Sequence, residues 1–136
     1  MKTALVTGAS RGIGAETARV LSREGWSVII NYNKSEKEAL KLAEELNASA
    51  VKADVSDLRQ VRDMFEKAGP VDLLVNNAGI AHYGLFTDTS EETWRRLFAV
   101  NVDGVYNCCW CALPHMIRKK QGCIINISSI WGVRGA

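Results

Sequence analysis

The segment Thr7-Gly8-Ala9-Ser10-Arg11-Gly12-Ile13-Gly14 directly follows a short apolar run and opens a helical pattern in this 136-residue chain. Glycine in such a loop lets the backbone approach a pyrophosphate closely, and the free N–H groups at the start of a helix attract the anion. An ordinary tight turn also uses glycine, for positive φ angles. The position between a strand and a helix favours the phosphate site. The residues predicted to bind a nucleotide here are Gly8, Ser10, Arg11, Gly12, Ile13 and Gly14.

Further polar segments follow other apolar runs of the chain. Asp54-Val55 comes after the third run, Asn76-Asn77-Ala78-Gly79 ends the fourth, and Ile127-Ser128-Ser129 ends the fifth. Together with the T-G-x-x-x-G-x-G loop, these segments make the chain resemble the short-chain dehydrogenase/reductase family over essentially all of its residues. Within that family it is similar to the 3-oxoacyl-[acyl-carrier-protein] reductases. The resemblance implies that the cofactor is also contacted by Asp54, Val55, Asn77, Ala78 and Gly79.

The resemblance also implies two catalytic residues. Ser129 matches the serine that hydrogen-bonds the reacting carbonyl, and its place after the fifth apolar run suits contact with a substrate. Ser128 is the adjacent candidate, and a local capping role is the alternative for either serine. Asn101 matches the family's helix asparagine, whose backbone carbonyl holds a water in a proton relay. A core asparagine bonded to neighbouring backbone is the alternative there.

The end of the second apolar run indicates which cofactor is used. NAD-binding folds of this type usually carry Asp or Glu there to accept hydrogen bonds from the ribose 2′-OH. This chain instead has Asn31, Tyr32 and Asn33, which we expect to line the cofactor site. Arg11 and Lys34 offer charge-assisted hydrogen bonds to a 2′-phosphate. NADP(H) is therefore predicted, the alternative being that both cations are solvated surface charges.

The activity that the resemblance implies is an NADPH-dependent reductase delivering hydride to a ketone. The expected substrate is a small-molecule or acyl-carrier-bound ketone, above all a 3-oxoacyl thioester. The segment Ser129-Ile130-Trp131-Gly132 is similar to a branch of the family that acts on a modified lysine of elongation factor P. A steroid or sugar alcohol also stays open. The competing hypothesis is a non-catalytic chain that binds a nucleotide or a partner.

A tyrosine and a lysine complete the family's catalytic set as Tyr-x-x-x-Lys shortly after the serine. The sequence stops at Ala136, and none of its three tyrosines has a lysine four residues on. Losing a positioned general acid costs roughly 10²- to 10⁴-fold in rate. We therefore expect the chain to be the N-terminal part of a longer reductase and to be inactive by itself.

Five apolar runs, at residues 3–7, 27–32, 49–53, 71–76 and 123–128, alternate with helical patterns. Runs with little polar alternation are typical of parallel strands that are covered on both faces. The alternation predicts right-handed crossovers and one α/β domain over residues 1–136. The expected fold is a Rossmann-type doubly wound parallel sheet in the order 3-2-1-4-5, truncated after its fifth strand.

Helix boundaries are indicated by capping residues. Ser35-Glu36-Lys37-Glu38 and Thr89-Ser90-Glu91-Glu92 have the form of capping boxes, and Ser56 is a candidate cap for a helix running to about Lys67. Gly25 and Gly69 suit helix C-terminal ends. The helix that contains Asn101 is expected to carry an apolar stripe at Leu97, Phe98, Val102, Val105, Cys109 and Leu113.

Composition excludes several other functions. A net charge of +2 with interleaved signs is a weak footprint for nucleic acid or an anionic membrane, so neither is predicted as a partner. No apolar run reaches the roughly 18 to 20 residues of a membrane span, and no signal peptide is visible, so a cytoplasmic location is expected. The four cysteines are expected to be reduced and to bind no metal. The family resemblance further implies a homodimer or homotetramer.

Overall fold

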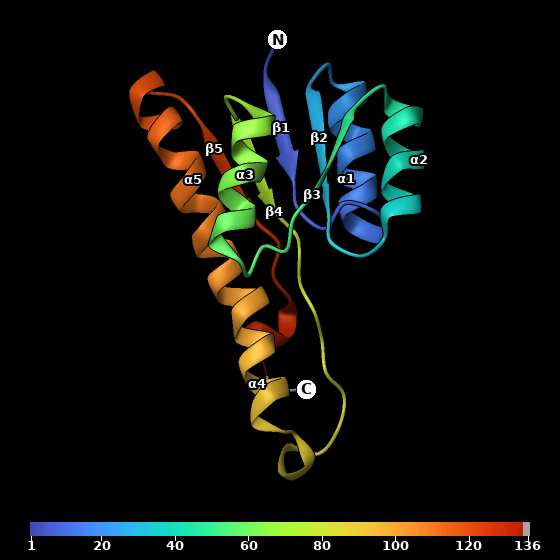
Figure 1. The fold of residues 1–136 in the computed structure, drawn as a ribbon, viewed down its shortest axis with the longest axis vertical. Coiled ribbons are helices and arrows are strands. Elements are labelled where there is room, and N and C mark those ends of the chain that lie inside the picture. The colour runs from blue at the N-terminus through green and yellow to red at the C-terminus, as the bar shows by residue number, and fades with distance from the viewer. Residues whose placement is uncertain (135–136) are drawn as a thin grey trace.

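The computed structural model describes residues 1–134, and five parallel strands in the order β3-β2-β1-β4-β5 form its centre (Figure 1). The strands are β1 (Thr3–Val6), β2 (Ser27–Tyr32), β3 (Ser49–Lys52), β4 (Leu73–Asn76) and β5 (Cys123–Asn126). The helices are α1 (Gly12–Arg23), α2 (Glu36–Leu46), α3 (Leu58–Ala68), α4 (Glu91–Phe98) and α5 (Gly104–Lys119). A π-helical turn, η2 (Ala99–Asp103), joins α4 to α5, and two 3-10 turns are η1 (Phe86–Asp88) and η3 (Ile130–Gly132). The predicted α/β Rossmann-type sheet and its strand order are confirmed.

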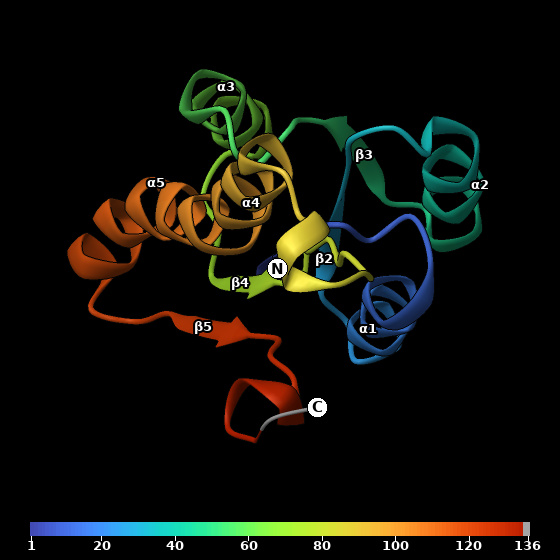
Figure 2. The same cartoon turned by 90° about the horizontal axis from the view of Figure 1, so that it is seen from below.

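Helices α1 and α2 lie on one face of the sheet, and helices α3 and α5 lie on the other (Figure 2). On β1, Ala4 and Val6 belong to the core shared with α1 and α2, whereas Leu5 belongs to the core shared with α3 and α5. Because both faces are buried, the central strands are mainly apolar, with polar residues confined to their ends, as the sequence analysis expected. The observed strands are the same as the predicted runs or up to two residues shorter, since the residues at the ends of these runs turn into loops.

The helix caps differ in detail from the predicted ones. Ser56 does not cap α3, because Asp57 does so with a carboxylate that accepts a hydrogen bond from the backbone N–H of Arg59 over 2.9 Å. At α4 the cap is Ser90 rather than Thr89, and its Oγ accepts from the backbone N–H of Thr93 over 3.1 Å. Neighbouring polar residues can each cap a helix, so the sequence located both starts only to within one residue.

The expected apolar stripe of the last helical segment is not the face that packs on the sheet. The buried residues are Val100, Gly104, Asn107, Cys108, Ala112 and Met116. Gly104 permits a close approach, because a Cβ there would lie 2.6 Å from Cγ2 of Val55. Apolar side chains occur on more than one face of this helix, so periodicity alone does not show which face is buried. The face with the small residues packs on the sheet, and the larger apolar side chains are exposed.

The apolar face left outside runs along α4, η2 and α5. We call it the outer stripe, and its members are between 40% and 69% exposed; they are Trp94, Phe98, Val102, Tyr106, Trp110, Leu113 and Ile117. Helix α4 and the loop before it extend below the sheet in Figure 1, beyond the carboxyl ends of the strands. Within residues 1–134, no helix has the length and apolar character needed to cross a membrane.

Candidate functional site

A cleft of about 510 Å³ opens at the carboxyl ends of the central strands. Its lining comes from segments far apart in the chain: Gly8, Ser10, Arg11, Asn31, Tyr32, Asn33, Lys34, Ser35, Ala53, Asp54, Val55, Asn77, Ala78, Gly79, Ile80, Arg96 and Val100. The fold thus gathers most of the residues predicted to bind a cofactor. Gly12, Ile13 and Gly14 instead form the first turn of α1 beside the cleft.

The glycine loop is fastened to the segment that follows β4. Oγ1 of Thr7 accepts hydrogen bonds from the backbone N–H groups of Asn77 and Ala78, each over 3.0 Å. Nδ2 of Asn77 donates in return to the carbonyls of Thr7 and Gly8 over 3.0 Å. A Cβ on Gly8, whose φ is +59°, would lie 2.8 Å from Cα of Ala78, so this glycine serves packing between the two loops.

The start of α1 suits a phosphate group. Its N-cap residue is Arg11, and within residues 1–134 no side chain caps the helix and no acidic side chain occupies its first turn. A Cβ on Gly12 would meet no described atom within 4 Å, so the backbone is open to a close approach there. Free N–H groups, a cation and an open backbone are the donor set that an anion requires. The residues present fit the pyrophosphate of a dinucleotide.

Asn31 at the end of β2 is buried and holds two loops together. Its Oδ1 accepts from the backbone N–H of Gly8 over 3.1 Å, and its Nδ2 donates to the carbonyl of Ala53 over 3.1 Å. Tyr32 is also buried, and its hydroxyl donates to Glu36 over 2.9 Å. Burial, helped by the hydrogen bond to Glu36, raises the pKa of Tyr32. Both side chains therefore shape the cleft mainly through protein contacts.

Arg11 and Lys34 lie on the cleft as exposed cations. Neither forms an ion pair with any residue in the described part of the chain. An unneutralised cation at the edge of a cleft attracts phosphate more strongly than a paired one. Their placement agrees with the expected 2′-phosphate contact, which stays a prediction.

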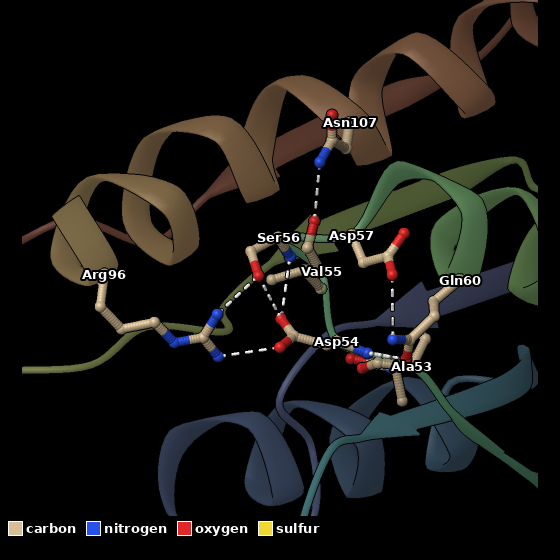
Figure 3. Close-up of polar contacts among 9 residues, drawn as sticks. Ala53, Asp54, Val55, Ser56, Asp57, Gln60, Arg96 and Asn107 are labelled. Atoms are coloured by element: carbon tan, nitrogen blue, oxygen red, sulfur yellow. Dashed lines mark hydrogen bonds and ion pairs between the residues drawn. The ribbon is translucent and has the colours of Figure 1, made fainter. Parts of the chain in front are cut away.

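The loop after β3 carries a polar cluster that also involves α4 (Figure 3). Oδ1 of Asp54 accepts from the backbone N–H of Ser56 over 3.0 Å and from its hydroxyl over 2.7 Å. Arg96 donates from Nη2 to Oδ2 of Asp54 over 2.8 Å and from Nη1 to Oγ of Ser56 over 2.7 Å. Burial alone would raise the pKa of Asp54, but the hydrogen bonds from Ser56 and Arg96 outweigh it and the pKa is lowered.

Arg96 was not found by sequence reasoning. It is separated from Asp54 by 42 positions in the chain, and neither helical periodicity nor a motif marks it. Further cleft residues that the sequence analysis did not assign to the cofactor are Ser35, Ala53, Ile80 and Val100. Only the folded arrangement places them there.

Asn101 lies in the π-helical turn η2 and is exposed, so it is not a core asparagine. Its Oδ1 accepts from the backbone N–H of Ile80 and its Nδ2 donates to the carbonyl of Ile80, each over 2.9 Å. A π-helical turn is often found at functional sites. The side chain thus fixes the chain just after Gly79 to the helix, and the role of its backbone carbonyl stays a prediction.

Ser129 follows β5 and is the N-cap of η3. Its Oγ accepts from the backbone N–H of Trp131 over 3.2 Å, which is the local capping role weighed above. Within residues 1–134, Ser129 and Asn101 share no hydrogen bond and lie outside the lining of the cleft. The exposed Ser129 hydroxyl still has a proton to donate, and its catalytic role stays a prediction.

Two of the four cysteines have thiols whose pKa is raised. Cys108 is buried, and this burial raises its pKa to about 12. Desolvation also raises the pKa of Cys111. In the part of the chain that the structure describes, no group of three or more His, Cys, Asp or Glu side chains is placed to hold a metal ion.

Comparison with known proteins gives consistent matches over the whole fold. The family model for short chain dehydrogenases matches residues 2–136. The 3-oxoacyl-[acyl-carrier-protein] reductase FabG of Staphylococcus aureus (strain Mu50 / ATCC 700699) is 41% identical, covering 98% of this chain and 58% of that protein. The oxidoreductase UcpA of Salmonella typhimurium (strain LT2) is 44% identical, covering 96% of this chain and 52% of that protein. The chain therefore spans little more than half the length of these curated relatives.

Solved structures of similar proteins share this fold. A crystal structure of a putative betaketoacyl-ACP reductase superposes with a TM-score of 0.94 at 36% identity, covering 99% of this chain and 57% of that one. A gluconate 5-dehydrogenase from Burkholderia cenocepacia J2315, solved with NADP and tartrate, gives a TM-score of 0.89 at 38% identity, covering 99% of this chain and 56% of that one. A blue fluorescent protein from a metagenomic library, solved in complex with NADPH, gives a TM-score of 0.90 at 36% identity, covering 99% of this chain and 58% of that one.

Proposed function

Because the chain belongs to the short-chain dehydrogenase family, we propose that it binds NADP(H) and takes part in hydride transfer to a ketone. The observation that carries the proposal is the cleft at the carboxyl ends of the strands, where the glycine loop, Asp54 and the segment after β4 meet. Solved relatives that contain NADPH and NADP support the same cofactor. When bound, NADPH supplies the hydride.

The chain's own residues bind and orient the dinucleotide. The uncapped N–H groups of α1 hold the pyrophosphate, and Arg11 and Lys34 hold the 2′-phosphate at the open end of the cleft. Asp54 and Val55 form the wall for the adenine. An acid is missing among residues 31–33, so nothing there repels the 2′-phosphate.

At the reacting end, Ser129 donates a hydrogen bond to the ketone oxygen. Asn101 fixes the backbone around Ile80, which continues the segment that lines the nicotinamide side of the cleft. The backbone carbonyl of Asn101 holds the water of a proton relay. These roles are proposed from the family resemblance together with the positions of the residues after β5 and in η2.

The substrate we propose is a 3-oxoacyl thioester, free or on an acyl carrier, since FabG and a betaketoacyl-ACP reductase are among the most similar proteins. A second candidate is a ketone on a modified lysine of elongation factor P, which the segment Ser129–Gly132 favours. In the structure this segment is an exposed turn after β5, with Ile130 and Trp131 open to solvent.

We also propose that the protein is a homo-oligomer that pairs through the outer stripe. Seven large apolar side chains in a row along two successive helices form a surface that a monomer seldom leaves in water. The family resemblance supports a second copy of the chain as the partner.

Titration with NADPH tests the binding step. We expect the nicotinamide fluorescence to change saturably, with weaker binding of NADH. Oxidation of NADPH is then measured with an acetoacetyl thioester as substrate and, for comparison, with a simple ketone that lacks the thioester. Binding of neither nucleotide would refute the cofactor proposal. Binding without oxidation of any ketone is the result expected of a chain that lacks the Tyr-x-x-x-Lys pair, so the non-catalytic hypothesis is favoured only if a chain that also carries this pair oxidises no NADPH.

A further inference from the structure

We propose that Arg96 is a positioning residue for the adenine end of the cofactor, acting through Asp54. The inference rests on the proposed nucleotide binding and adds a residue of α4 that no motif identifies. Arg96 lines the cleft beside Asp54 and Val100, so its guanidinium stands at the wall that the adenine would meet.

The guanidinium holds two members of the loop after β3 at once. Its two terminal nitrogens donate to different residues, one to Oδ2 of Asp54 and the other to Oγ of Ser56. The hydroxyl of Ser56 in turn donates to Oδ1 of Asp54, which closes a ring of three hydrogen bonds (Figure 3). Because the two donors of the planar guanidinium have a fixed geometry, they set the Asp54 carboxylate and the Ser56 hydroxyl relative to each other, which a single ammonium group cannot do.

Asp54 keeps the capacity to accept one more hydrogen bond. A carboxylate accepts about four, and Oδ1 already takes two from Ser56 while Oδ2 takes one from Arg96. The remaining lone pair belongs to Oδ2, the oxygen whose direction Arg96 fixes. The exocyclic amino group of adenine is a donor of the matching kind. Hypoxanthine carries a carbonyl oxygen at the same place, which a carboxylate repels.

The backbone of the loop is held independently of Arg96. Nδ2 of Asn107 donates to the carbonyl of Val55 over 2.9 Å in the buried core, and Gly104 packs against the side chain of Val55. Removing the guanidinium therefore releases Oδ2 of Asp54, whereas Oδ1 stays bonded to Ser56 and the loop stays in place. The loss of Arg96 is expected to affect recognition of the base more than the shape of the cleft.

The test compares NADPH with its hypoxanthine analogue, deamino-NADPH, by fluorescence titration. We expect the unmodified protein to bind NADPH about tenfold more tightly than the analogue. In Arg96→Ala this ratio falls towards one, because NADPH binds more weakly while the analogue changes little. Arg96→Lys retains the positive charge but not the two fixed guanidinium donors, and it is expected to recover only part of the ratio.

Arg95→Ala is the matched control, because Arg95 is one position away on α4 and, among residues 1–134, forms an ion pair with Glu91 alone on the surface. It is expected to keep the full ratio. An unchanged ratio in Arg96→Ala and Ser56→Ala, with tight binding of NADPH, would overturn the inference alone. Equal weakening of both nucleotides in these variants, with circular dichroism unchanged, would also overturn it. Failure of the unmodified protein to bind either nucleotide would overturn the proposed function as well.

Discussion

The buried amide of Asn31 accepts a hydrogen bond from the backbone N–H of Gly8 over 3.1 Å and so ties the end of β2 to the glycine loop after β1. The same side chain donates to the carbonyl of Ala53 at the end of β3. One residue thus sets the positions of three strand ends that border the cleft. Sequence reasoning placed Asn31 at the cofactor, and the structure gives it this supporting contact.

Asn31→Ala is predicted to destabilise the fold. It leaves the part-buried N–H of Gly8 and the buried carbonyl of Ala53 without these partners, at a cost of about 1 to 3 kcal/mol. Urea unfolding followed by circular dichroism measures the change. Asn33→Ala, two positions on and only half-buried, is the control and is expected to change stability by less than about 0.5 kcal/mol. Equal stability of the two variants would contradict the prediction.

Gly14→Ala is predicted to disrupt the glycine loop. The new Cβ would lie 2.5 Å from Nδ2 of Asn77 and 2.6 Å from the carbonyl oxygen of Gly8, and these two atoms are themselves hydrogen-bonded. We expect a loss of about 1 to 3 kcal/mol in stability and weaker NADPH binding. Gly25→Ala, where no described atom lies within 4 Å, adds only backbone strain of about 1 to 2 kcal/mol and leaves binding unchanged.

The strands were predictable because parallel strands buried on both faces are continuous apolar runs. Their order was predictable because a doubly wound Rossmann-type sheet has a characteristic strand order. The glycine loop was predictable because its spacing and its place after β1 are both visible in the sequence. These two features locate the carboxyl edge of the sheet, and with it most of the cleft.

What the sequence did not show depends on contacts between distant segments. Asp54 and Arg96 meet only because α4 extends beyond the strand ends, and no local pattern encodes that contact. The buried face of α5 was missed because Gly104 and Ala112 are small, whereas the hydrophobic pattern gives most weight to large side chains. Ser56 was taken as a cap, although Asp57 is the cap and Ser56 belongs to the polar cluster.

Arg11→Ala and Lys34→Ala are each predicted to weaken NADPH binding about tenfold or more, since a charge-assisted hydrogen bond to phosphate is lost. NADH lacks the 2′-phosphate, so its dissociation constant is expected to change less than about twofold. Competition titrations with both cofactors measure the two effects. Lys37→Ala, an exposed lysine on α2, should leave the NADPH constant unchanged. An equal rise in the dissociation constant of NADH would show that these cations do not bind the 2′-phosphate.

Asp72 is predicted to contribute to acid sensitivity of the fold. Its carboxylate accepts from Lys119 and from the backbone N–H of Thr3, and these hydrogen bonds lower its pKa in the folded state. A lowered folded-state pKa means that the stabilisation is present above the unfolded value of about 3.9 and is lost as the pH falls through the folded value. Asp72→Asn should therefore show a smaller loss of stability between about pH 5 and about pH 2.

Urea unfolding at several pH values measures this slope. Asp63→Asn removes an exposed carboxylate from α3 that forms no ion pair with the described residues, and it serves as the control. A slope that is unchanged in Asp72→Asn, or reduced equally in Asp63→Asn, would show that the Asp72 contacts do not carry the effect.

The outer stripe is predicted to be the surface through which two copies associate. Tyr106, 62% exposed, lies in the middle of this row of seven side chains. Tyr106→Asp places a charge where the partner would exclude water, and we expect the dimer dissociation constant to rise at least about 30-fold. Light scattering coupled to size-exclusion chromatography measures the mass. Leu40→Asp, which alters an apolar residue on α2 that is 53% exposed, should leave the mass unchanged. A monomeric unmodified protein, or a dimer that survives Tyr106→Asp, would refute the proposed interface.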